Sequence, residues 1–183
     1  MSLTDFLKSA DSIRDIIAGY RQFDFASAMP RTRGSPFWRY FRGVKEVFTE
    51  RGETASAIFT NVIRCAAETQ GAGQGYSLWS IDENIRRTYL DWQKGLLTAE
   101  LRALAPTLIV FVSGPYYDDY LTEEFEGLEM TAVEPFDERV LSRLRAPGLG
   151  DVPAYRTYHP GYLNRVKRFG FGTLEAAIRD AEK

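Results

Sequence analysis

Apolar residues recur at helical spacing in three stretches of the chain. Residues 11–23 predict a short amphipathic helix, and a second helix begins at Ser35-Pro36, the residue types preferred at the N-cap and at the first helical position. Residues 80–104 predict one long helix capped by Ser80. Its expected inner face carries Ile85, Tyr89, Trp92, Leu96 and Leu101.

Short apolar runs between these helices predict strands. The clearest is 107–112, which is almost wholly aliphatic or aromatic and is followed by Ser113-Gly114-Pro115, so we expect a central parallel strand there. Further strands are predicted over 56–63, 128–133 and 154–158, a short helix over 138–144, and a last helix after Thr173. Helices alternating with buried strands indicate an α/β fold, a three-layer α/β/α sandwich around a short, mainly parallel sheet.

Composition narrows the class of protein. The chain has 183 residues, enough for one domain, 1–183, in which 1–33 reads as helix and loop. A net charge of −2 argues against non-specific coating of nucleic acid, which needs an excess of cations. Cys65 is the only cysteine, which excludes an intrachain disulfide and fits a reducing cytoplasm. No apolar run approaches the roughly 20 residues that span a bilayer, so no membrane partner is expected.

Candidate chemistry gathers where strands are predicted to end. Asn61 and His159 follow or close predicted strands, and Phe37 begins the second helix. Ligands of open α/β sheets bind at the carboxyl ends of the strands. Each residue also has a structural interpretation: a buried amide satisfied by hydrogen bonds, a lone histidine at a strand end, and an aromatic packed in the core.

The order of the motifs resembles a known family. Phe59-Thr60-Asn61-Val62-Ile63-Arg64-Cys65 comes first, then a long helix ending in Leu-x-Pro, an aliphatic strand ending in Gly, and Tyr158-His159-Pro160-Gly161-Tyr162-Leu163. This set resembles the uracil-DNA glycosylase superfamily, over 34–170. It is similar to bacterial members that carry an iron–sulfur cluster, and more similar to poorly characterised phage and bacterial relatives with a Gly114-Pro115-Tyr116-Tyr117-Asp118 turn.

The resemblance implies roles around a base flipped from its stack. Phe37 would stack on the base, Asn61 would read the N3–H and O4 edge of uracil, and His159 would hydrogen-bond O2, where negative charge develops. Leu163 matches the wedge that fills the gap left in a duplex. Arg165 belongs to a basic group that would contact DNA.

Three departures from the family pattern limit what is implied. The first motif, a strand and a Gly-rich loop with a water-orienting Asp, Asn or Glu, has no counterpart in residues 1–30, so we expect a chain lacking the family's first strand or a divergent member. Cys65 alone cannot hold a four-cysteine cluster, so no cofactor is expected. Gly161 stands where the family usually has Ser. If active, the protein would be a DNA glycosylase of DNA repair, an N-glycosidic bond hydrolase; the missing motif favours base or DNA binding over excision.

Two other functions stay open. The first is an inactive interaction or scaffold domain that binds a protein partner, or a second copy, through an uncovered sheet edge. The second, a small-molecule transferase or hydrolase, ranks last because the chain has no Gly-rich phosphate loop and no Ser or Cys nucleophile motif. Two basic groups fit a nucleic-acid groove and solvated helix faces equally well. They are Arg31, Arg33, Arg39, Arg42 and Lys45, and Arg156, Arg165, Lys167 and Arg168.

Overall fold

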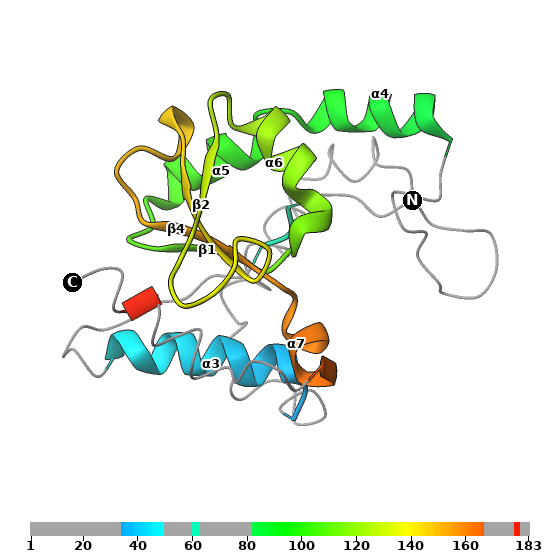
Figure 1. The fold of residues 1–183 in the computed structure, drawn as a ribbon. Helices are drawn as coiled ribbons and strands as arrows, with labels where there is room; N and C mark the ends of the chain where they lie inside the picture. Colours follow the sequence, from blue (N-terminus) through cyan, green and yellow to red (C-terminus); the bar gives the residue numbers. More distant parts are fainter. Residues whose placement is uncertain (1–33, 50–59, 63–81, 167–177, 180–183) are drawn as a thin grey trace, which may run out of the picture.

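A computed structural model of the protein describes residues 34–49, 60–62, 82–166 and 178–179. The described elements form an α/β structure (Figure 1). The helices are α3 (Pro36–Thr49), α4 (Glu83–Gln93), α5 (Leu96–Leu104), α6 (Asp118–Glu124) and α7 (Pro160–Val166). The strands are β1 (Ile109–Phe111), β2 (Glu129–Ala132), β3 (Leu141–Arg145) and β4 (Ala154–Thr157). The predicted helix over 11–23 lies outside the described residues.

The sheet is mixed, which corrects the prediction of a mainly parallel one. The strand order is β1-β4-β3-β2, and only β1 and β4 run parallel. β3 is antiparallel to both of its neighbours. Short connections, 133–140 and 146–153, join β2 to β3 and β3 to β4, and connections of this length suit antiparallel neighbours, whereas β1 and β4 have the long crossover that parallel pairing needs.

β3 replaces the helix predicted over 138–144. Leu141 and Leu144 are three positions apart, a spacing that suits one face of a helix, but in a strand it places them on opposite faces. Leu141 packs in one core cluster and Leu144 in another, and both are buried. A strand buried on both faces therefore produced the spacing that had predicted a helix.

The two core clusters lie on opposite faces of the sheet. The first includes Leu97 of α5, Leu121 of α6 and Phe111 of β1. The second includes Tyr155 of β4 and Leu163 of α7. In Figure 1, α5 and α6 lie on one side of the strands, and α3 and α7 on the other.

The single helix predicted over 80–104 is two helices. α4 begins after Asp82, whose carboxylate accepts from the N–H groups of Asn84 and Ile85, so the cap is not Ser80. The chain breaks at Gly95, which has a φ of 82°. The expected inner face is largely exposed: Ile85, Trp92 and Leu96 are 62%, 52% and 43% exposed.

The other predicted strands have mixed outcomes. β1, β2 and β4 fall within 107–112, 128–133 and 154–158, as predicted. β1 ends the sheet order rather than standing at its centre, as far as the described residues show. Of the strand predicted over 56–63, residues 60–62 are described and are irregular.

The helical residues 178–179 lie in the predicted last helix. No helix in the described ranges is long and apolar enough to cross a membrane.

Candidate nucleobase site at the carboxyl ends of β1 and β4

The parallel strands β1 and β4 end together, and their loops touch. The Gly114 N–H, just after β1, donates to the Thr157 carbonyl at 2.9 Å. Gly114 has a φ of 67°, and a Cβ there would lie 3.1 Å from Cδ1 of Tyr158. Only glycine combines this backbone conformation with so close an approach, so Gly114 holds the Tyr158-His159 segment against the end of β1.

His159 caps α7. Its Nδ1 accepts from the N–H of Gly161 at 3.0 Å, and a Cβ on Gly161 would lie 3.1 Å from the same nitrogen, so a glycine there gives the ring its close approach. Burial, and secondly the charge of Arg165, lower the pKa of His159 below its ordinary 6.5. A neutral ring that accepts at Nδ1 carries its proton on Nε2. His159 therefore presents one N–H donor to the surroundings at neutral pH.

Phe37 lies beside His159. The two ring centroids are 5.7 Å apart with an interplanar angle of 19°, a stacked arrangement. The two rings are nearly parallel, and their centroid separation lies within the range of stacked aromatic pairs. Trp38 packs edge-on against the Phe37 ring at 4.7 Å.

Two contacts explain how residues so far apart in sequence meet. Ser35 Oγ accepts from the Trp38 N–H at 3.3 Å and starts α3, as predicted for the Ser-Pro start. α3 then packs along α7, where Arg39 Nη2 donates to Asn164 Oδ1 at 2.9 Å (Figure 1). The first turn of α3 and the N-terminus of α7 are thereby brought to one place.

The segment that carries Asn61 contacts other parts of the chain than Phe37 and His159 do. Its neighbour Thr60 donates to Glu100 of α5 at 3.2 Å, and Val62 packs against the first core cluster. The Asn61 side chain is exposed, and within the described residues no hydrogen bond joins it to Phe37 or His159. The structure therefore brings together two of the three residues expected to hold the base.

The two residues expected to contact DNA differ in exposure. Leu163 is 1% exposed and belongs to the second core cluster, so in this conformation its side chain cannot act as a wedge in a duplex. The reason is that Leu163, four positions after the cap, faces the sheet. Arg165 is exposed. Of the two basic groups, Arg39 is exposed and Arg156 is 1% exposed, so Arg156 does not line a groove.

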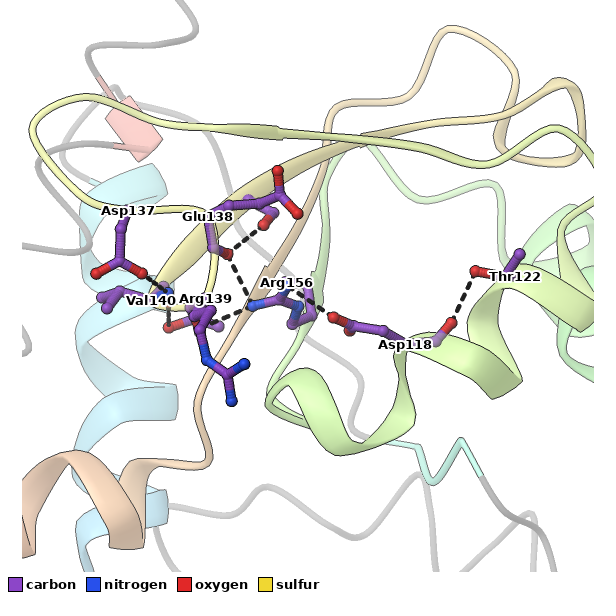
Figure 2. A network of polar contacts seen from close by, with 9 residues as sticks. Asp118, Thr122, Asp137, Glu138, Arg139, Val140 and Arg156 are labelled. Carbon is purple, nitrogen blue, oxygen red and sulfur yellow. Dashed lines mark hydrogen bonds and ion pairs between the residues drawn. The ribbon is translucent and has the colours of Figure 1, made fainter.

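Arg156 is instead the centre of a buried polar network (Figure 2). Its Nη1 donates to the carbonyls of Glu138 and Arg139 at 3.0 and 2.9 Å, and its Nη2 to Asp118 Oδ2 at 2.9 Å. Burial raises the pKa of Asp118 despite the opposing effect of Arg156. The network ties the 137–140 loop, the start of α6 and β4 together beside the candidate site.

Three tyrosines surround the site, and sequence reasoning identified their surface only in part. The rings of Tyr158 and Tyr162 pack against each other with centroids 4.7 Å apart and a tilt of 31°. Tyr116, in the Gly-Pro turn after β1, is 74% exposed. A hydrogen bond with Tyr158 and, less strongly, the electrostatic effect of Tyr116 raise the pKa of Arg139. Arg139 lies in the stretch for which the sequence predicts a helix, and nothing in the sequence indicates its place beside Tyr158.

A hollow lies between α4 and α6, away from Phe37 and His159. Its volume is ≈ 430 Å³, and both acidic and basic side chains line it. Leu90 and Tyr120 are its only uncharged lining residues. No group of three or more potential metal ligands occurs in the part of the chain that the structure describes.

The position of His159 predicts a dependence of stability on pH. Because the folded state lowers its pKa, the unfolded chain binds more protons just below pH 6.5, so the free energy of unfolding rises with pH through that window and levels off above it. For a partly exposed ring we expect a change of less than about 1 kcal/mol. Urea unfolding at about pH 5 and about pH 7.5 measures it.

His159→Asn is the matched variant for this prediction. Asn keeps a capping acceptor for the Gly161 N–H and cannot titrate. His159 is the only histidine in the chain, so no other imidazole contributes to the slope. An unchanged slope near pH 6 in the variant would contradict the assignment.

Comparison with known proteins found no matching family model, curated protein or solved structure. The assignment of a family and a function therefore depends on the motifs and on the geometry of the site.

Proposed function

We propose that the protein is a uracil-DNA glycosylase-like domain that binds a nucleobase between α3 and α7, in a three-layer α/β/α arrangement. The observation that carries the proposal is the pairing of Phe37 with His159. An aromatic face next to a single N–H donor offers what a pyrimidine needs, a stacking surface and a donor to a carbonyl oxygen.

Each residue contributes a separate part of the binding. In this proposal the base stacks on the Phe37 ring, and the Nε2–H of His159 donates to a carbonyl oxygen such as O2 of uracil. A neutral donor suits a neutral carbonyl because it introduces no unpaired charge into a half-buried site. Asn61, whose neighbour Thr60 is bonded to Glu100 of α5, is not part of the proposed site.

The proposed activity is binding. His159 is placed to stabilise charge developing at O2, but excision also needs a group that orients water or stabilises the sugar cation. None of the residues that meet at this site has been assigned that role. The protein would then hold a base without releasing it from its sugar.

Titration of the protein with free uracil tests the proposal. We expect chemical-shift changes at Gly161 and at neighbouring N–H groups in a proton–nitrogen NMR spectrum. Phe37→Ala is expected to weaken binding about tenfold through lost stacking, and His159→Ala by several-fold through a lost hydrogen bond.

Two controls make the result specific. Thymine has the same hydrogen-bonding edge with an added methyl group, and adenine has a different edge, so adenine should bind more weakly. Arg102→Ala, on the exposed face of α5, should leave uracil binding unchanged. A spectrum that does not change with uracil, or changes equally in Phe37→Ala, would exclude the site.

A further inference from the structure

The tyrosines beside the base site lie near Arg139 or contact one another. We call Tyr116, Tyr158 and Tyr162, together with Arg139, the tyrosine face. Tyr158 packs on Gly114, and the ring of Tyr162 packs at a tilt against that of Tyr158. Tyr162 is 40% exposed and Tyr116 is 74% exposed, so two of the three rings have faces open to a ligand. Exposed aromatic rings that are already held by neighbours lose little conformational freedom on binding.

Arg139 adds a fixed cation to this face. Its carbonyl accepts from the buried Arg156 at 2.9 Å, which anchors the backbone, while its own side chain is exposed. Figure 2 shows the guanidinium of Arg139 pointing away from the carboxylate of Glu138. The neighbouring acid Asp137 is turned to its own loop, where it accepts from the Val140 N–H at 3.2 Å. Arg139 also hydrogen-bonds Tyr158, which holds its guanidinium on the tyrosine face, where its exposed N–H groups can donate to a phosphate.

The exposure of the side chains on α7 favours a single-stranded ligand over a duplex. A protein that flips a base out of a duplex fills the vacated space with an apolar wedge. Leu163 has the sequence position of that wedge but lies in the core. Its neighbour Tyr162 is exposed, and a tyrosine ring suits stacking on an unpaired base.

We propose that the tyrosine face binds the nucleotides flanking the held base, and that the ligand is a single-stranded nucleic acid rather than a duplex. The inference rests on the proposed function, because it places the flanking nucleotides on the strand whose base lies at Phe37 and His159. Bases stack on Tyr162 and Tyr116, and phosphates contact Arg139 with the exposed Arg39 and Arg165.

Fluorescence anisotropy with a labelled DNA strand of about 12 nucleotides, containing one deoxyuridine among thymidines, tests the inference. The second probe is a hairpin duplex with the same deoxyuridine strand. We expect the single strand to bind at least about tenfold more tightly than the duplex. Tyr162→Ala should weaken single-strand binding about five- to tenfold, since stacking on one base is lost.

Conservative and remote variants separate stacking from folding. Tyr162→Phe keeps the ring and should retain wild-type affinity. Arg139→Gln should weaken binding about threefold and lower the slope of log affinity against log salt by about one, as expected for one lost phosphate contact. Trp92→Ala removes an exposed aromatic ring on α4, which lies far from α7 in Figure 1. It should leave the affinity for the single strand unchanged.

Three results would overturn the inference: equal affinity for strand and hairpin, a Tyr162→Ala protein that binds like wild type, or a Tyr162→Phe protein as weak as Tyr162→Ala. The free-uracil titration is run on the same samples. Uracil binding without a preference for single strands refutes the tyrosine face alone. Tyrosine-dependent strand binding without uracil binding refutes the base site at Phe37 and His159.

Discussion

Replacing Arg156 by Met is expected to lower the free energy of unfolding by about 3–5 kcal/mol, because the buried guanidinium is lost as a donor to the partly exposed carboxylate of Asp118 and to two backbone carbonyls. The side chain is 1% exposed and serves three acceptors, two of which are backbone carbonyls of the 137–140 loop. Without the guanidinium, the carbonyls of Glu138 and Arg139 lose a charged donor. Asp118 loses the cation that offsets the cost of burying its carboxylate.

Arg156→Lys tests whether charge or geometry matters. Lysine keeps the charge but is a single-point donor, so it cannot serve acceptors that diverge around a planar guanidinium. We expect it to recover less than half of the loss. Arg102→Met, at an exposed position of α5, should change stability by no more than about 0.5 kcal/mol.

Urea unfolding measures all three variants. An Arg156→Met protein within about 1 kcal/mol of wild type would show that the network is dispensable. Because the anchored loop carries Arg139, the same variant should also weaken single-strand binding where it remains folded.

Replacing Glu124 by Ala is expected to lower the free energy of unfolding by about 2–4 kcal/mol, because N–H groups at the start of α5 lose their acceptor. Gly95, at the N-cap, has no side chain to cap the helix. Glu124 of α6 supplies the missing acceptors: Oε2 accepts from the Gly95 N–H at 2.9 Å, and Oε1 accepts from the N–H and the hydroxyl of Thr98 at 3.0 and 2.9 Å. A carboxylate at a helix N-terminus is also favoured by the helix dipole.

Two further variants show how much of the loss of stability comes from the Glu124 carboxylate. Glu124→Gln keeps an acceptor oxygen and loses the charge, so we expect about half the cost of the Ala variant. Glu123→Ala, at the exposed neighbouring position, should change stability by no more than about 0.5 kcal/mol. The measurement is the unfolding free energy in urea, and hydrogen exchange at Thr98 reports the cap directly. Slow exchange at Thr98 in Glu124→Ala would contradict the role given to the carboxylate.

Local sequence determined several parts of the fold and of the site. The Ser35-Pro36 start predicted the beginning of α3, because capping and the fixed φ of proline act within one turn. Three aliphatic or mixed runs predicted β1, β2 and β4, since short strands bounded by turn residues carry their own signal. His159 at the end of the last strand was likewise predicted from its position in the chain.

The rest was decided by contacts between distant segments. α4 and α5 separate at Gly95, where the backbone is left-handed, and Glu124 of α6 satisfies the N–H groups of Gly95 and Thr98 at the start of α5. The glycine lies within 80–104, but the acceptor comes from another segment. β3 is a strand because it pairs on both edges and buries both faces, whereas the spacing of its apolar residues fits a helix equally well.

Sequence alone thus determined which residues end up at the carboxyl ends of β1 and β4, since strand ends and caps are local. It did not determine which of them are exposed. The motif presents Tyr162 and Leu163 as neighbours, and only the packing of α7 against the sheet buries Leu163 and leaves Tyr162 in solvent. Exposure depends on what covers a side chain, and the covering segments come from elsewhere in the chain.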